Sequence, residues 1–84
     1  MSSPTEKHRD WLNFPREHIK RPVLWEFTRE FEIVTNIRQA TVTEDTGIVS
    51  LEMEGAREEI QRGIAWLEEL GVKVEPVEFG AIEG

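Results

Sequence analysis

Residues 60–78, IQRGIAWLEELGVKVEPVE, decide the fold, because a helical pattern there ends on a glycine and a strand pattern follows at once. Ile60, Ile64 and Leu67 recur at the i, i+4, i+7 spacing of one helix face. Gly71 can adopt the left-handed conformation that closes many helices, and the next four residues alternate apolar and polar side chains as in a half-buried strand. A helix that enters a strand through one glycine must pack back over the sheet that the strand joins. The stretch therefore predicts an α+β fold with helices layered on a sheet.

The residues before this stretch supply the other elements. A short strand is expected at 11–14, a helix with an aromatic-rich stripe begins at Pro22, and β-branched runs at 35–43 and 48–54 predict a hairpin whose second strand ends at Gly55. The order is strand, helix, strand, strand, helix, strand. This order predicts a ferredoxin-like βαββαβ sandwich, with a four-stranded antiparallel sheet in the order 4-1-3-2 and two helices on one face.

The length of 84 residues fits one domain, since two halves of such a chain could not each bury a core. Residues 1–8 carry no apolar pattern and are expected to be a disordered lead-in. Residues 9–79 are expected to form the domain, and residues 80–84 a tail.

The chain contains no cysteine, which excludes disulfides, thiolate metal sites and a cysteine nucleophile. No apolar run approaches the ~20 residues of a membrane span, and the polar start lacks the apolar segment of a signal peptide. We therefore expect a cytoplasmic protein without membrane insertion.

The net charge of −7 is uneven: residues 1–22 hold five basic and three acidic side chains, 5 − 3 = +2, which leaves −9 for the rest. An acidic body repels phosphate backbones, so nucleic acid is not expected as a partner. The basic segment is either a solvated tail or a contact for an acidic surface.

Three segments, PVLWEFTREFEIVTNI, GIVSLEMEG and IAWLEELGVKVEPV, together resemble the NIL domain. This small ferredoxin-like module is named for an Asn-Ile-Leu signature, and it occurs at the carboxyl end of the ATPase subunit of bacterial methionine importers and fused to some ferredoxins. The resemblance extends roughly over residues 12–78, and its most specific part is the last segment. It implies a module that pairs with its twin and can bind methionine near the dimer interface.

The chain departs from the family pattern in three respects. Arg38 stands where the signature has an apolar residue, and the hairpin between the second and third strands is shorter than in the importer version. The sequence has no GxxxxGK[ST] loop, so no ATPase is part of it. The chain is then either the module alone or a fragment of a longer protein, and Met1 and the tail favour a complete stand-alone module.

Asn36 and Ile37 match the first two letters of the signature, and the resemblance implies that they and Arg38 lie at the ligand-binding site. An amide can donate to a ligand carboxylate and accept from its ammonium group. The alternative is that Asn36 only bonds the backbone of its own turn.

Trp11 is out of phase with Leu12 and Phe14, so it should lie on the sheet face that the helices leave open. Ile37 and Ile48 are expected to extend this apolar patch, which a second copy of the chain would cover. The alternation within residues 35–43 is imperfect, so a bulge or burial on both sides remains an alternative. Trp66 is expected at the rim of the core.

No metal, cofactor or catalytic residue is predicted. His8 and His18 lack a third ligand at a regular spacing, and no nucleophile has a base at a readable distance. The leading hypothesis is a non-catalytic, dimeric regulatory module that binds methionine or a related sulfur amino acid. The alternatives are a protein–protein adaptor and an accessory subunit in sulfur-amino-acid metabolism.

Overall fold

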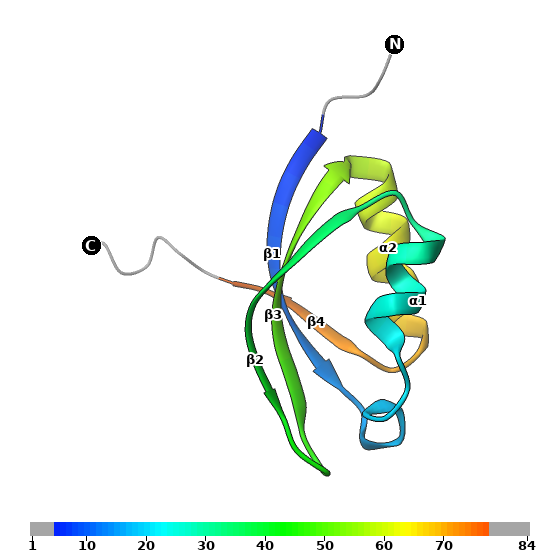
Figure 1. The fold of residues 1–84 in the computed structure, drawn as a ribbon. Helices are drawn as coiled ribbons and strands as arrows, with labels where there is room; N and C mark the ends of the chain where they lie inside the picture. The colour runs from blue at the N-terminus through cyan, green and yellow to red at the C-terminus, as the bar shows by residue number, and fades with distance from the viewer. Residues whose placement is uncertain (1–4, 78–84) are drawn as a thin grey trace, which may run out of the picture.

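The computed structural model describes residues 5–77 and confirms the predicted ferredoxin-like fold (Figure 1). Two helices pack on one antiparallel sheet of four strands, whose order β2-β3-β1-β4 is the predicted 4-1-3-2 read from the other edge. The elements are β1 (Thr5–Phe14), the short 3-10 helix η1 (Arg16–His18), α1 (Val23–Glu30), β2 (Val34–Val42), β3 (Gly47–Ala56), α2 (Arg57–Glu69) and β4 (Lys73–Pro76).

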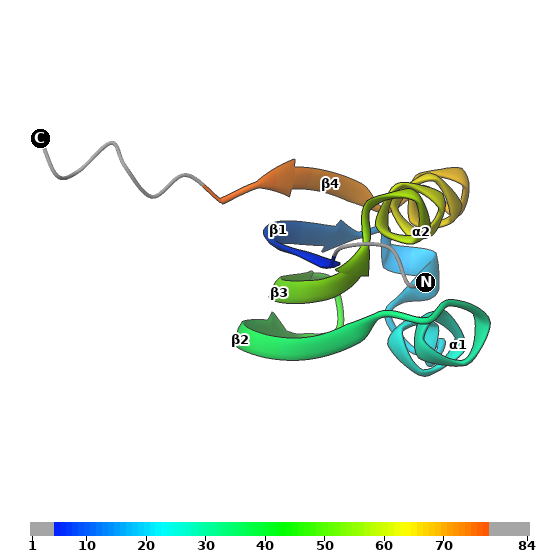
Figure 2. The ribbon, with the colours of Figure 1, turned by 90° about the horizontal axis from the view of Figure 1, so that it is seen from above.

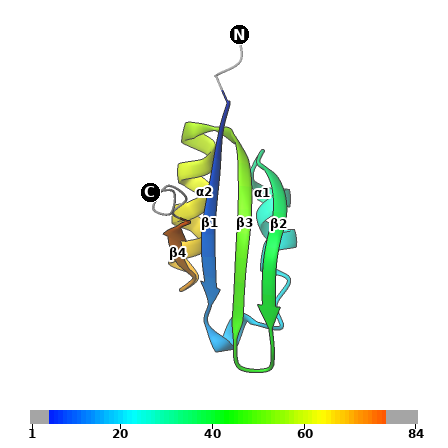
Figure 3. The same ribbon diagram turned by 90° about the vertical axis from the view of Figure 1, so that its left-hand side faces the viewer.

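Both helices lie on the same face of the sheet, which we call the helix-covered face; the opposite one is the open face (Figure 2). Seen from the open face, α2 lies behind β4 and β1, and α1 lies toward β2 (Figure 3). The core between the two layers is apolar, as burial of the helix stripes and of one strand face requires. Its fully buried side chains include Leu12, Phe27, Leu51, Met53, Ile60 and Leu67.

The end of α2 follows the sequence prediction. Gly71 has φ of +94°, a conformation that a residue with a Cβ rarely adopts. The N–H of Gly71 donates to the carbonyl of Glu68 at 2.9 Å, and the N–H of Val72 donates to that of Leu67 at 3.0 Å. These two bonds are those of a Schellman motif, which satisfies the last carbonyls of the helix and turns the chain into β4.

The two helices approach closely at Gly63, where a Cβ would lie 2.8 Å from Cε1 of Phe27 and 3.0 Å from Cδ1 of Ile33. Beside this contact, the ring of Trp66 packs against Phe27 and Phe31, with centroids 6.2 Å and 5.9 Å apart. Trp66 is half-buried, so it lies at the rim of the core as predicted.

The first strand begins earlier than the sequence indicated. Residues 5–8, expected to be disordered, belong to β1, where Thr5 pairs with Ala56 and His8 with Met53. This part of the strand has polar side chains on both faces, so it lacks the apolar alternation by which strands are recognised. Residues 1–4, the tail at 80–84 and the domain end at residue 79 lie outside the described residues.

Gly55 does not end the third strand, because β3 continues to Ala56 and Gly55 pairs with Glu6. A Cβ at this position would lie 3.0 Å from the carbonyl oxygen of Glu32. The glycine therefore permits a close backbone approach within the strand, which a sequence pattern cannot distinguish from a strand end.

Candidate functional site

The predicted ligand residues lie together on β2, an edge strand of the sheet. Asn36 pairs with Glu52 and Ile37 with Leu51, and a β-bulge interrupts the register between Ile37 and Gln39. Asn36, Ile37 and Arg38 are all exposed. The side chain of Asn36 makes no hydrogen bond within residues 5–77, so its amide is available to a ligand or a second chain.

The bulge also decides which faces the predicted dimer residues occupy. Opposed residues of antiparallel strands share a face. Ile37 therefore lies on the helix-covered face with Leu51, whereas Trp11, opposite Ser50, and Ile48, opposite Thr41, lie on the open face. The expected single patch of Trp11, Ile37 and Ile48 is thus wrong. The extra residue at Arg38 reverses the alternation, as the bulge alternative anticipated.

The open face is a mixed surface. Trp11 and Ile48 are half-buried and lie in a shallow hollow of about 560 Å³ beside Gln39 and Thr41. In the next row of the sheet, a guanidinium nitrogen of Arg9 lies 3.9 Å from a carboxylate oxygen of Glu52. Polar and charged groups therefore interrupt the apolar surface that the sequence suggested for this face.

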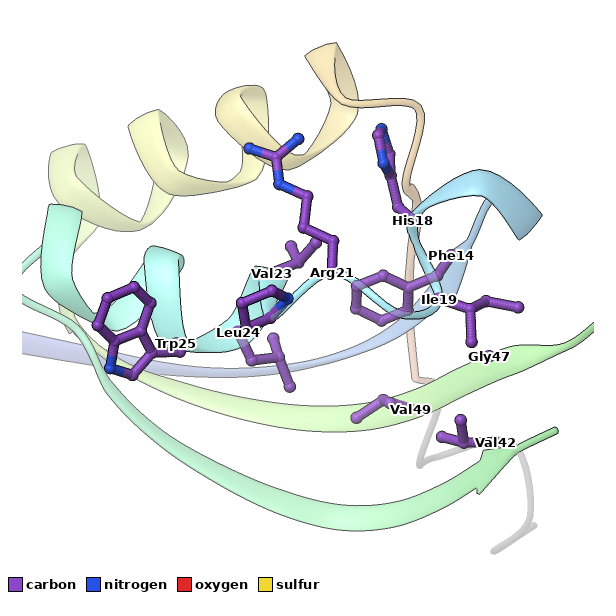
Figure 4. Close-up of a pocket in the computed structure, with 11 residues that line it drawn as sticks. Phe14, His18, Ile19, Arg21, Val23, Leu24, Trp25, Val42, Gly47 and Val49 are labelled. Carbon is purple, nitrogen blue, oxygen red and sulfur yellow. The ribbon is translucent and has the colours of Figure 1, made fainter. Parts of the chain in front are cut away.

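A second apolar region lies on the helix-covered face, between α1 and β2. Among residues 5–77, the exposed large apolar side chains include Trp25 of α1 (58% exposed) and Ile37 and Val42 of β2 (55% and 61%). Trp25 and Val42 flank a groove of about 210 Å³ (Figure 4). We call it the α1–β2 groove, and its apolar lining includes Phe14, Ile19, Leu24, Trp25, Val42 and Val49.

No sequence pattern predicted this groove, because its apolar residues come from five separate elements or turns. Leu24 and Phe14 fit core patterns, and Val42 fits a strand pattern, so none of them signals a cavity by itself. The one available signal was Trp25, which lies off the core stripe of its helix and is exposed although apolar.

The charged groups at the groove lie on its rim. The guanidinium of Arg21 donates to both carboxylate oxygens of Glu26, at 2.9 and 2.7 Å. These hydrogen bonds hold the pKa of the Glu26 carboxyl below its usual value and raise the pKa of Arg21. Figure 4 shows Arg21 and His18 extending away from the sheet, while Leu24 points toward it. The floor of the groove is therefore apolar.

A polar stripe follows β1 on the helix-covered face. Arg57 of α2 bonds Glu6 at 2.7 Å, Glu6 lies 3.1 Å from the ring of His8, and Asp10 is the next residue of the row. The hydrogen bond from Arg57, followed by that from His8, lowers the pKa of Glu6, whereas burial raises the pKa of Asp10 against the opposing charge of His8. Within residues 5–77, no three side chains of His, Cys, Asp or Glu are arranged to hold a metal ion.

None of the described helices is long and apolar enough to cross a bilayer.

These features define the class of the protein: a ferredoxin-like α+β module with an exposed edge strand and an apolar groove beside it. The sequence profile of the NIL domain matches residues 11–76, most of the chain. The chain therefore belongs to the NIL domain family, as the resemblance indicated.

Curated relatives agree with this assignment, and a solved structure shares the fold. The chain is 37% identical over 68 residues to the methionine import ATP-binding proteins MetN 1 of Salmonella choleraesuis and MetN of Escherichia coli K12. In each case the match takes in 76% of this chain but only 20% of the relative, whose carboxyl-terminal region it resembles. The C-terminal domain of an ABC transporter ATP-binding protein from Enterococcus faecalis shares the fold, with a TM-score of 0.72, 22% identity and coverage of 83% and 82% of the two chains.

Proposed function

We propose that this chain is a non-catalytic regulatory module of the cytoplasm that binds methionine or a related sulfur amino acid as a homodimer. The proposal is supported by the importer relatives, whose printed name is methionine import ATP-binding protein. A ligand regulates such a module only if it binds one state of the protein more tightly than another. A ligand site shared between two copies meets this condition, because ligand binding then favours the paired state.

The observation that carries the proposal is the exposed edge of β2. This strand is nine residues long and pairs with β3 alone among the described strands, so its outer backbone groups face away from the sheet. It also exposes Val34 (69%), Ile37 and Val42. A long, exposed edge strand can act as a template for pairing with another chain. Antiparallel pairing of β2 with its counterpart would cover both the backbone groups and these side chains.

Such pairing also gives Asn36 a role. A two-fold axis at the middle of Val34–Val42 places Asn36 of one copy opposite Ala40 of the other. The free amide of Asn36 then lies at the junction of the two copies, where it can meet the carboxylate or ammonium group of an amino acid. Arg38, at the bulge, adds a positive charge at the same junction.

The test is calorimetric titration of the chain with L-methionine, with Asn36→Ala as the variant and Asn13→Ala as its control. Asn13 is an exposed asparagine on β1, two strands away from the edge. We expect saturable binding to the native chain, a loss of about tenfold in affinity for Asn36→Ala and no loss for Asn13→Ala. Absence of binding to the native chain at millimolar methionine would refute the ligand part of the proposal.

The second candidate is a protein–protein adaptor, which includes an accessory subunit in sulfur-amino-acid metabolism. The hollow around Trp11 and Ile48 on the open face favours it, because a half-buried aromatic beside polar groups suits a protein contact. A partner purified with the native chain but lost from Trp11→Ala would support this candidate, whereas unchanged capture would count against it.

A further inference from the structure

We propose that protonation of Asp10 controls the docking of β4 on β1: β4 stays closed over β1 while the Asp10 carboxyl is neutral, and it opens locally when this carboxyl is ionised. The inference concerns a conformational device of the fold and does not depend on the proposed function. It is carried by the position of one buried carboxyl beside β4, which has only four residues and lies at an edge of the sheet.

The Asp10 carboxyl is buried between the two layers. It lies on the helix-covered face and is 6% exposed, and its Oδ2 has no hydrogen-bond partner among the described residues. An ionised carboxyl loses far more hydration free energy on burial than a neutral one. Burial accordingly raises the pKa of Asp10, and the charge of His8 offsets this effect only in part. The closed structure therefore accommodates the neutral form better than the ionised form.

The charged groups around Asp10 are engaged elsewhere. On the same face of β1, the ring of His8 lies 3.1 Å from Glu6, and Arg57 of α2 bonds Glu6 at 2.7 Å. The strands β3 and β4 present only uncharged residues on this face, since their charged residues Glu52, Glu54, Lys73 and Glu75 lie on the open face. The other charged residues of α2 are the exposed Glu58, Glu68 and Glu69 and the ion pair of Glu59 with Arg62.

The end of β4 is the cover nearest to solvent. Asp10 pairs with Leu51 on its inner side and with Pro76 of β4 on its outer side. The N–H of Val77 donates to the carbonyl of Arg9 at 3.0 Å, so the adjacent pair of Asp10 and Pro76 is a non-hydrogen-bonded one, in which side chains lie close together. Pro76 is itself exposed. On this side, a single exposed residue of an edge strand therefore shields the carboxyl from water.

The other routes by which water could reach Asp10 disrupt more of the fold. The pairing of β1 with β3 extends over ten residues, whereas its pairing with β4 extends over four. The helix α2 lies behind β4 and β1 (Figure 3), and lifting it would expose the fully buried Ile60 and Leu67. Folds open most readily where few buried apolar contacts are lost. We therefore expect the end of β4 to yield first when Asp10 is ionised.

The direction of the pH dependence follows from this geometry. The closed state binds the Asp10 proton more tightly than an open state in which the carboxyl is hydrated, so acid favours closure. Closure weakens as the pH rises through the pKa of Asp10 in the closed state. Protonation of His8 acts in the same direction, because its positive charge lowers the cost of an ionised Asp10. Opening is thus more frequent at neutral than at acidic pH.

The experiment is amide hydrogen exchange of the full chain, measured by NMR from about pH 4 to about pH 7 and corrected for the intrinsic effect of pH on exchange. The reporters are the amides of Glu75 and Val77 at the end of β4, with Leu51 of β3 as the reference. We expect the β4 amides to exchange faster than Leu51, at rates that low concentrations of urea barely change, as local opening requires. Their opening equilibrium should rise about fivefold from acid to neutral pH.

Two variants assign the effect to Asp10. Asp10→Asn keeps the size of the side chain and removes its ionisation, so its β4 amides should be as protected at neutral pH as those of the native chain in acid. Asp45→Asn removes an exposed carboxylate in the turn between β2 and β3, and it should leave the pH dependence of β4 as in the native chain. Chemical shifts in the rest of the spectrum report whether each variant folds.

Three results would overturn the proposal. In the first, the β4 amides of the native chain exchange only together with Leu51 and with the same dependence on urea, so that β4 has no opening of its own. In the second, local opening of β4 does not change with pH. In the third, Asp10→Asn retains the pH dependence of the native chain. The first two are read from the native chain alone, so the test does not depend on the folding of a variant.

Discussion

At the scale of single residues, Asp10 is the position where the fold and the chemistry conflict. It lies on the helix-covered face opposite Leu51, is 6% exposed, and its Oδ2 has no hydrogen-bond partner among the described residues. Burial raises its pKa because the charged form loses water, and the charge of His8 offsets this loss only in part. Burial of Asp10 could not be predicted from the sequence, since an aspartate beside Trp11 and Leu12 is equally compatible with a solvated strand position.

Asp10→Asn should therefore stabilise the protein at neutral pH. A carboxyl whose folded pKa lies above its unfolded pKa contributes most to stability when protonated, and this contribution is lost as the pH rises through the folded pKa. The asparagine variant avoids this loss, so it should exceed the native protein by about 1 kcal/mol in unfolding free energy at neutral pH. Urea unfolding at neutral and mildly acidic pH measures the difference, which should shrink toward acid.

The control is Asp45→Asn, because Asp45 is exposed and its ion pair with Arg16, at 3.0 Å, is a surface pair of small energetic value. Two results would contradict the prediction: a difference in unfolding free energy between Asp10→Asn and the native chain that stays constant across this pH range, and a variant that is the less stable of the two. Either result would show that the charge of Asp10 does not destabilise the fold.

At the scale of elements, α2 depends on Gly63 for its distance from α1. An alanine normally favours a helix over glycine by about 1 kcal/mol. Here its Cβ would lie 2.8 Å from the buried ring of Phe27, so the ring or the helix must shift. Overpacking of this kind costs about 1–3 kcal/mol. Gly63→Ala should therefore lower thermal stability despite the gain in helix propensity, as calorimetry can measure.

Ala65→Gly is the reverse exchange at an exposed site of the same helix. It therefore measures the contribution of helix propensity to stability without any change in core packing. We expect it to cost about 1 kcal/mol. If Gly63→Ala instead raised the melting temperature by an amount that mirrors this cost, the close contact between α1 and α2 would not limit the packing of the helices.

The elements also show what sequence patterns can and cannot predict. The helix stripes, Gly71 and the alternation of β3 are local signals, and each predicted its element. The start of β1 at Thr5 and the passage of β3 through Gly55 depend on pairing between distant strands, which local patterns do not record. The face of Ile37 depends on one bulge, and a one-residue slip moves every later side chain to the other face.

At the scale of the whole molecule, local sequence patterns identified one part of the candidate site and could not identify the other. Asn36, Ile37 and Arg38 were found from a short motif, and the structure places them on the exposed edge of β2. The residues that line the α1–β2 groove are spread along the sequence between Phe14 and Val49 and come together only in the complete fold. No contiguous motif could therefore have identified the groove. The open face proved more polar than predicted because Arg9 and Glu52 occupy its middle. The dimer proposal consequently rests on the edge of β2.

Sedimentation of two matched variants tests this central claim most directly. Ile37→Lys places a charge on the exposed β2 edge, and Ile48→Lys makes the same change on the open face of the neighbouring strand. We predict that the native chain and Ile48→Lys sediment as dimers whose association methionine strengthens, and that Ile37→Lys sediments as a monomer, because pairing would bury its charge. A native chain that stays monomeric with methionine present, or a dimer lost in Ile48→Lys but kept in Ile37→Lys, would contradict the account.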